Sequence, residues 1–212
     1  MDKIKYNKIA VLGKSKKFII KIKKNYRFKQ LDIIPWRQTK LFSKKMSSKY
    51  NLIFVCGFDF NLYTKNIIFF KKKNIFEILD LLKRISNKHT IIVYINTKIE
   101  NNRSHTYSRY KYAKQKLAYL INKSFKKNII YNSDLIKEEN KISINSNLSS
   151  RFIFYIFSKL KLIKTIEIKK IFLDINNLMY SKNYSNQKNI KGIFLKIPRS
   201  QFLDRLFRII FG

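Results

Sequence analysis

The stretch that decides the fold is residues 90–121, TIIVYINTKIENNRSHTYSRYKYAKQKLAYLI. Its first part, residues 91–95, is a continuous apolar and β-branched run, which is typical of a buried strand. Its second part carries Ala113, Leu117 and Ile121 at a spacing of one helical turn, which indicates the buried side of a helix. A buried strand followed by a helix is the repeating unit of a parallel sheet flanked by helices.

Three polar side chains of this stretch form a candidate catalytic group. Thr97 ends the expected strand, Tyr110 comes thirteen residues later, and Lys114 follows four residues after Tyr110. One helical turn separates the phenol from the ammonium, which lowers the phenol's pKa and can hold a ribose hydroxyl. With the Thr97 hydroxyl orienting a substrate oxygen, the pattern indicates a proton relay beside a nicotinamide. Tyr107 and Lys111 repeat the same spacing and are the alternative pair.

Short apolar runs alternate with helical patterns along the rest of the chain, which predicts an α/β fold with a Rossmann-like, doubly wound parallel sheet. The other expected strands are residues 8–12, 31–34, 52–55, 128–131, 166–168 and 193–197. The other expected helices are residues 75–85, 152–162, 171–179 and 200–212, and residues 138–147 are expected to form a loop. We expect residues 1–137 to be a dinucleotide-binding domain and residues 138–212 to be a small C-terminal substrate or lid region.

The turn after the first expected strand is a candidate phosphate site. Gly13, Lys14, Ser15 and Lys16 stand where a pyrophosphate would meet the N-terminus of a helix. The full dinucleotide fingerprint would have glycines at positions 13, 16 and 19, but the chain has Gly13, Lys16 and Ile19. Lys14 and Lys16 could compensate by direct charge. The alternative is an ordinary glycine between a strand and a loop.

Two further strand ends carry candidate cofactor contacts. Arg37 follows the second strand, where a guanidinium could bind the 2′-phosphate of an adenine ribose. Cys56 and Gly57 follow the third strand, where a small residue would leave room for the cofactor's central sugar. The alternatives are an ordinary surface arginine and a cysteine that serves as a small core residue.

In this order of features the chain resembles the short-chain dehydrogenase/reductase superfamily, in its extended epimerase/dehydratase branch. The resemblance runs almost end to end on short segments: KIAVLGKSKKFI, DIIPWR, YNLIFVCG, NIFEILDLLKRI, VYINT, YKYAKQKLAYLI, NIIYNSDLI, TIEIKKIFLDINNLM and KGIFLKIP. It implies that Tyr110 is the acid/base, Lys114 its activator and ribose ligand, and Thr97 the orienting hydroxyl. The chain departs from the family in its lost glycines, its short length, and Ala118, where the family often has an acid.

The resemblance implies a protein like an NAD(P)-dependent oxidoreductase or epimerase that acts on a sugar nucleotide, in surface-polysaccharide biosynthesis. The cofactor would be NAD or NADP, and Arg37 with the lysines of the first turn favours NADP. A pseudoenzyme on the same fold is the alternative within this class, because the phosphate turn has lost two glycines.

Composition keeps a second class of function open. The chain has 47 Lys and Arg against 12 Asp and Glu, a formal net charge of +35, which is typical of nucleic-acid binding. The lysines are scattered, however, and are accompanied by abundant Asn, Ile, Phe and Tyr, as in proteins from AT-rich genomes. A basic nucleic-acid-binding or ribosomal-type protein is therefore the rival hypothesis, with segments such as SRYKYAKQK stacking on bases.

The remaining composition predicts a soluble, cytoplasmic protein. The single cysteine, Cys56, excludes an internal disulfide, and His89 and His105 are too few for a zinc site of the usual His/Cys kind. No apolar run approaches the ~20 residues of a membrane helix. The amphipathic helix expected at residues 201–212 would dock on the domain or on a second subunit, giving a homodimer; the alternative is a helix on a membrane surface.

Overall fold

A computed structural model describes residues 4–13, 16–36, 49–58, 67–97, 105–138, 141–142, 155–156, 159–160 and 164–181. These residues form a five-stranded sheet in the order β2-β1-β3-β4-β5, and every adjacent pair is parallel. The strands are β1 (Ile4–Leu12), β2 (Tyr26–Ile34), β3 (Leu52–Val55), β4 (Ile91–Thr97) and β5 (Asn128–Ser133). The predicted α/β fold with a doubly wound parallel sheet is confirmed.

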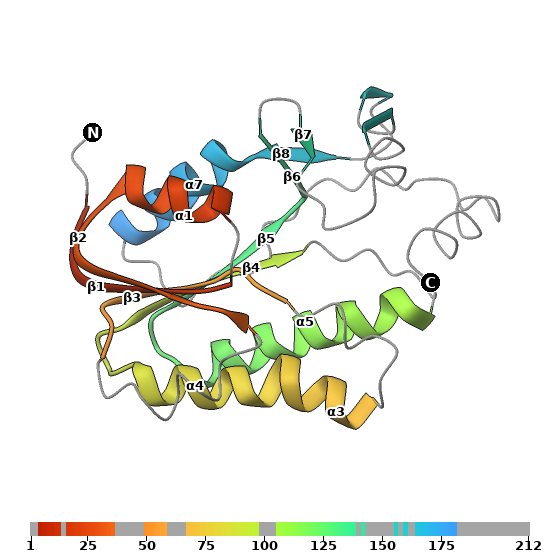
Figure 1. Ribbon diagram of the computed structural model, residues 1–212, viewed down its shortest axis with the longest axis horizontal. Helices are drawn as coiled ribbons and strands as arrows, with labels where there is room; N and C mark the ends of the chain where they lie inside the picture. Colours follow the sequence, from red (N-terminus) through yellow and green to blue (C-terminus); the bar gives the residue numbers. More distant parts are fainter. Residues whose placement is uncertain are drawn as a thin grey trace.

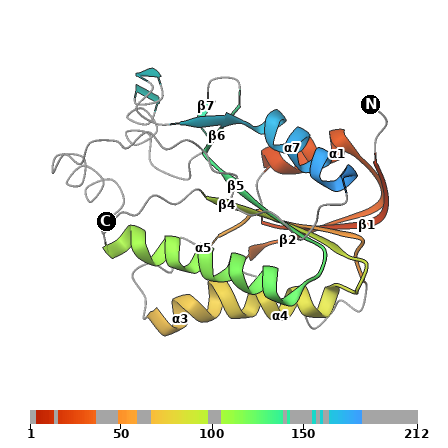
Figure 2. The same ribbon diagram turned by 180° about the vertical axis from the view of Figure 1, so that it is seen from behind.

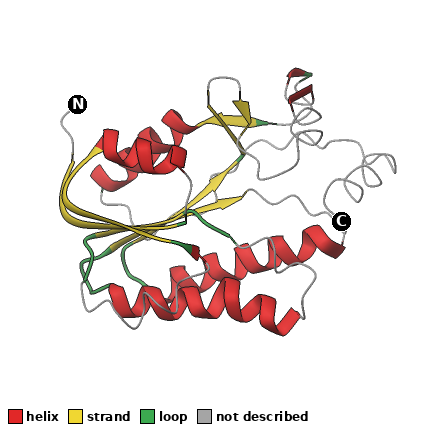
Figure 3. Ribbon diagram, viewed as in Figure 1, coloured by secondary structure: helices red, strands yellow, loops and turns green. Residues whose placement is uncertain are grey.

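Helices cover both faces of this sheet (Figures 1 and 3). One face carries α1 (Lys16–Asn25) and α7 (Ile168–Tyr180). The other carries α5 (His105–Ser124) and a long helical segment formed by α3 (Ile67–Lys71), the π-helical turn η3 (Lys72–Phe76) and α4 (Glu77–Ile85). Figure 2 shows the same three layers from behind.

Alternation along the strands divides the core between the two faces. On β4, Val93 and Ile95 pack toward α1 and α7, while Ile92 and Tyr94 pack toward α4 and α5. The residues of β3 are fully buried because helices cover both of its sides. That double burial explains the unbroken apolar run from which this strand was predicted.

Two strands extend beyond the segments that their apolar residues predicted. β1 begins at Ile4 and β2 at Tyr26, and their first halves pair only with each other. In β2 polar residues alternate with apolar ones, as in a strand with one solvent-exposed face. The apolar run alone therefore marked only the covered end of each strand.

A small second sheet joins residues on both sides of the predicted domain boundary at 137. Its order is β7-β6-β8, with β6 (Leu135–Glu138), β7 (Lys141–Ile142) and β8 (Thr165–Glu167). The loop predicted over residues 138–147 is wrong at β7, because backbone pairing with β6 makes a strand from residues without a strand-like pattern. Helix α7, from beyond residue 137, packs on the large sheet through Ile171 and Phe172. The division into two domains stays a prediction.

Several predicted elements lie outside the described residues, namely the strand at 193–197, the terminal helix at 201–212 and most of the helix at 152–162. Within the described part of the chain, no helix combines the length and the apolar character needed to span a bilayer.

Candidate functional site

The chain reverses its direction of travel across the sheet between β1 and β3. From β1 it moves through α1 to β2 on one side, and it then returns to β3 on the other side of β1. In doubly wound sheets ligands bind at such a switch point, outside the carboxyl ends of the strands. The predicted residues Gly13 and Gly57 both lie there, directly after β1 and just beyond β3.

Gly13 and Gly57 touch one another across the switch point. Gly13 has a φ of 124°, a backbone conformation that L side chains rarely adopt. A Cβ on Gly13 would lie 2.9 Å from the backbone nitrogen of Gly57. The Gly13 N–H donates to the carbonyl of Ile34 at 2.9 Å, and the Cys56 N–H donates to that of Leu12 at 3.0 Å. Both turns are therefore held by backbone hydrogen bonds. Position 13 requires a glycine, because a side chain there would be strained by the φ of 124° and would meet the backbone of Gly57.

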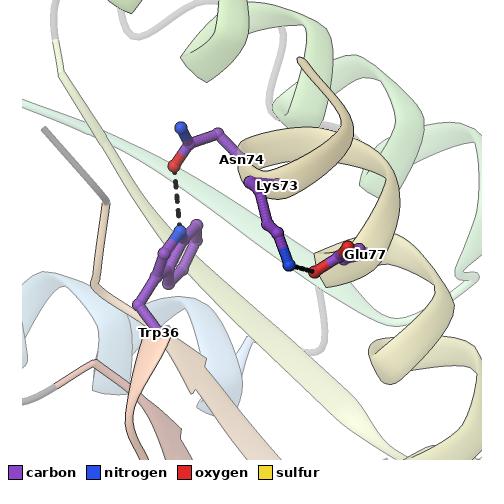
Figure 4. Close-up of polar contacts among 4 residues, drawn as sticks. All are labelled: Trp36, Lys73, Asn74 and Glu77. Atoms are coloured by element: carbon purple, nitrogen blue, oxygen red, sulfur yellow. Dashed lines mark hydrogen bonds and ion pairs between the residues drawn. The ribbon is translucent and has the colours of Figure 1, made fainter. Parts of the chain in front are cut away.

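The space beside Gly57 is filled by the indole of Trp36, which follows β2. A Cβ placed on Gly57 would lie 2.6 Å from Cε3 of Trp36. The Trp36 Nε1–H donates to Oδ1 of the fully buried Asn74 in η3, at 2.9 Å (Figure 4). Next to Asn74 in this turn, Lys73 forms an ion pair with Glu77 at 2.9 Å. The Trp36 ring thus fills the space beside Gly57 in this structure, and the contact of Cys56 and Gly57 with a cofactor stays a prediction.

Lys114 lies buried under the carboxyl end of β4. Its Nζ donates to the carbonyl of Ile95 at 2.8 Å and stands 5.0 Å from the centre of the Tyr94 ring. Only 6% of the residue is exposed, and this burial lowers the pKa of the ammonium to about 8. Helix α5 positions it, because Ala113 and Leu117 on the same side of the helix are buried. A buried amine held at a strand end is a strong indication of a functional group.

Cys56 is the ionisable neighbour of Lys114. Burial raises the pKa of the thiol to about 12, although the nearby Lys114 charge opposes that rise. The Sγ lies 3.5 Å from the carbonyl oxygen of Leu12, toward which the thiol can donate. Since the thiol stays protonated at neutral pH, Cys56 is not an activated nucleophile in this structure. Cys56 is thus a small, polarisable side chain close to Lys114.

The end of β4 also carries a buried acceptor that no donor among the described residues satisfies. Asn96 is 5% exposed, and its Nδ2 donates to Oδ1 of Asn132 at 2.8 Å. Its own Oδ1 accepts no hydrogen bond from the described residues. Because buried amide oxygens without a donor are rare in native proteins, this oxygen is a candidate acceptor for a ligand. Asn96 was not predicted; its place directly before Thr97 was the available signal.

The other predicted site residues fall into two groups. Thr97 is the last residue of β4, and Tyr110 lies one turn before Lys114 in α5; for both, only the backbone is described. The backbone thus has the strand end and the helix that were expected, while the side-chain roles stay a prediction. Lys16 is the first residue of α1. Lys14, Ser15 and Arg37 lie outside the described residues.

The end of β4 and the ends of β2 and β3 differ in the groups that they present. At β4 the orphaned Asn96 oxygen and the buried Lys114 ammonium offer an acceptor and a donor for a polar ligand. Between β2 and β3 the Trp36 ring occupies the space beside Gly57. Sequence reasoning missed Trp36, although a tryptophan directly after the Pro35 that ends a strand was a visible signal.

Among the described residues, no group of three or more His, Cys, Asp or Glu side chains could hold a metal ion. No protein-family model matches the chain, and no curated protein matches its sequence. The crystal structure of a dTDP-4-dehydrorhamnose reductase from Clostridium acetobutylicum is similar, with a TM-score of 0.53 and 16% identity. The match covers 84% of this chain and 71% of that one. At this identity the likeness establishes the fold: the chain has the Rossmann-like α/β architecture of that reductase.

Proposed function

We propose that the protein is an NAD(P)-dependent reductase-like or epimerase-like protein that acts on a sugar nucleotide. The observation that carries this proposal is Lys114, a buried ammonium at the carboxyl end of β4, one helical turn after Tyr110. The likeness to a structure whose protein reduces a dTDP-linked sugar supports the choice of substrate class. A role in surface-polysaccharide biosynthesis is the finer part of the proposal.

A nicotinamide dinucleotide bound at this edge would supply or accept the hydride. Lys114 would donate a hydrogen bond to a ribose hydroxyl and, as an ammonium beside Tyr110, lower the pKa of the phenol. Tyr110 would transfer a proton to or from the substrate oxygen, and Thr97 would orient that oxygen. Asn96 would offer its buried Oδ1 to a ligand N–H or O–H. A pseudoenzyme would keep the binding part of this scheme without turnover.

The test is a thermal-shift and titration experiment with NAD and NADP, followed by assays of NADPH oxidation with dTDP-4-dehydro sugars. A ligand that binds only the native state raises the melting temperature. Through Arg37 and Lys14, NADP should bind more tightly than NAD, and Arg37→Ala should abolish the difference. The proposal is refuted if neither dinucleotide binds at about millimolar concentration, which is near the weak end of specific affinities.

A second candidate, binding of a nucleic acid, is favoured by one observation. A groove of about 370 Å³ lies at the opposite end of β1 and β2, and its lining includes Lys5, Arg27 and Lys29. Lys5 and Arg27 are paired in register, and like charges directly opposite one another are unfavourable unless an anion compensates them. Within the part of the chain that the structure describes, no ion pair joins these three cations to a carboxylate.

Single-stranded RNA in the same thermal-shift series distinguishes the two candidates. If the groove binds phosphates, Arg27→Glu should weaken RNA binding and reduce its salt dependence by about one phosphate contact. Lys123→Glu, on the exposed end of α5, is the matched control for net charge. Equal losses in both variants would indicate nonspecific attraction to a basic protein.

A further inference from the structure

Trp36 crosses the switch point of the sheet. It follows β2, whereas Gly57, against which its ring lies, follows β3, and β1 runs between these two strands. The indole therefore reaches over the carboxyl end of β1 to contact the far side. Its exposure is only 7%, so the ring is packed as a core residue and not as a surface side chain.

The ring is held in place by a specific partner. Oδ1 of Asn74 accepts the indole N–H at 2.9 Å, and Asn74 itself is fully buried. Asn74 lies in η3, and π-helical turns inside longer helices occur frequently at functional sites. The ring of Phe58, the residue after Gly57, is tilted by 35° relative to the indole, and the two ring centres are 6.5 Å apart. An amide and an aromatic ring thus fix the indole in one orientation.

In a doubly wound fold the adenosine half of a dinucleotide extends from the switch point toward the end of the second strand. The Trp36 indole lies on that path, between the end of β2 and Gly57. The nicotinamide half would lie toward β4, where Lys114 and Asn96 are. Even a Cβ built on Gly57 would lie 2.6 Å from Cε3 of Trp36, so the indole leaves no space beside this glycine for an adenosine ribose.

We propose that Trp36 is a gate on the adenosine half of the cofactor site, held closed by Asn74 and displaced when a dinucleotide binds. This inference rests on the proposed function and concerns the regulation of that same site. Opening breaks the Trp36–Asn74 hydrogen bond and moves a buried ring, so only a fraction of the free protein is competent to bind. The apparent affinity is reduced by that fraction.

The chain itself supplies the reporter, because Trp36 is its only tryptophan. Titration of the full-length protein with NADP should shift the tryptophan emission to longer wavelength as the indole leaves its buried position. The shift should saturate at the same concentration as the heat signal in calorimetry. Saturable dinucleotide binding with unchanged emission overturns the gate and leaves the proposed function standing.

Variants that open the gate should strengthen binding of the adenosine half alone. Trp36→Ala should lower the Kd for 2′,5′-ADP about tenfold, equivalent to the ~1.4 kcal/mol lost with a latching hydrogen bond and its packing. The Kd for nicotinamide mononucleotide should not change, since that half lies toward β4. Trp36→Phe keeps the core filled but cannot donate to Asn74, so a smaller gain is expected, and it preserves the test if Trp36→Ala does not fold.

The latch is tested by Asn74→Ala, which leaves the indole but removes its acceptor and should give a gain similar to that of Trp36→Phe. Phe76→Ala is the matched control, because Phe76 belongs to the same π-helical turn but is 49% exposed. Equal affinities of the parent and all three gate variants for 2′,5′-ADP would refute the gate. If neither the parent nor any variant binds a dinucleotide or either half, the proposed function fails and the gate with it.

Discussion

The β4 half of this sheet edge and the half at β2 and β3 contain different kinds of side chain. At the end of β4 the structure buries polar groups, namely the Lys114 ammonium, its acceptor on Ile95 and an unsatisfied oxygen on Asn96. Between β2 and β3 it packs Trp36 against Gly57 and Phe58, as in a hydrophobic core. Burying unsatisfied polar groups costs stability, whereas packing a ring contributes to it. The β4 half therefore loses stability to its buried polar groups, whereas the closed half at β2 and β3 gains stability from ring packing.

The largest effect is expected for Tyr110→Phe, which removes only the hydroxyl proposed to act beside Lys114. If the β4 half carries the chemistry, turnover should fall by roughly two orders of magnitude or more, the usual effect of losing an acid/base group. The assay is NADPH oxidation, with circular dichroism to check the fold. A variant as active as the parent would contradict the assignment and direct attention to Tyr107 with Lys111.

The rigidity of the closed half is tested at its two glycines. Gly13→Ala should destabilise the protein by ~2 kcal/mol, because its φ of 124° strains any side chain and its Cβ would meet backbone atoms of Gly57. Gly57→Ala meets the Trp36 ring first, and a side chain can shift more readily than backbone. We expect it to cost ~1 kcal/mol and to move the tryptophan emission to longer wavelength. Chemical unfolding measures both costs, and a larger effect at Gly57 would show that the ring is the more rigid partner.

The last prediction concerns the pH dependence of stability through the charge on Lys114. Burial lowers its pKa from the ordinary value of 10.5 to about 8, so the native state releases this proton before the unfolded chain does. Between about pH 8 and pH 10.5 the unfolded state therefore binds more protons, and this group adds stability as the pH rises. Relative to Lys114→Met, the parent should gain roughly 3 kcal/mol of stability over this range, or about 10 °C in melting temperature.

The matched control for removal of a lysine charge is Lys123→Met, at an exposed position on the same helix. A difference between Lys114→Met and the parent that stays constant with pH would mean that the Lys114 ammonium is hydrated.

Some strands and contacts of this fold could be predicted from the sequence, and others could not. Residues 91–95 and 52–55 lie in central strands that helices cover on both faces, so their apolar runs mark the strands directly. The strand β7 was missed because Lys141 and Ile142 have no pattern of their own and depend on pairing with β6. The contact between Trp36 and Gly57 could not be predicted, because a glycine indicates that something comes close, but not whether it is a ligand or a ring from the protein.

From the sequence alone one could predict the five strands of the large sheet, the doubly wound class, and the placement of Thr97, Tyr110 and Lys114 along one strand and one helix. These features follow from local periodicity, which is written in consecutive residues. Only the tertiary structure decided that Trp36 crosses β1 to reach Gly57 and that Lys114 is buried next to Cys56. Each of these contacts joins residues that are distant in the chain, and the parallel order β2-β1-β3-β4 brings their strand ends together at one edge of the sheet.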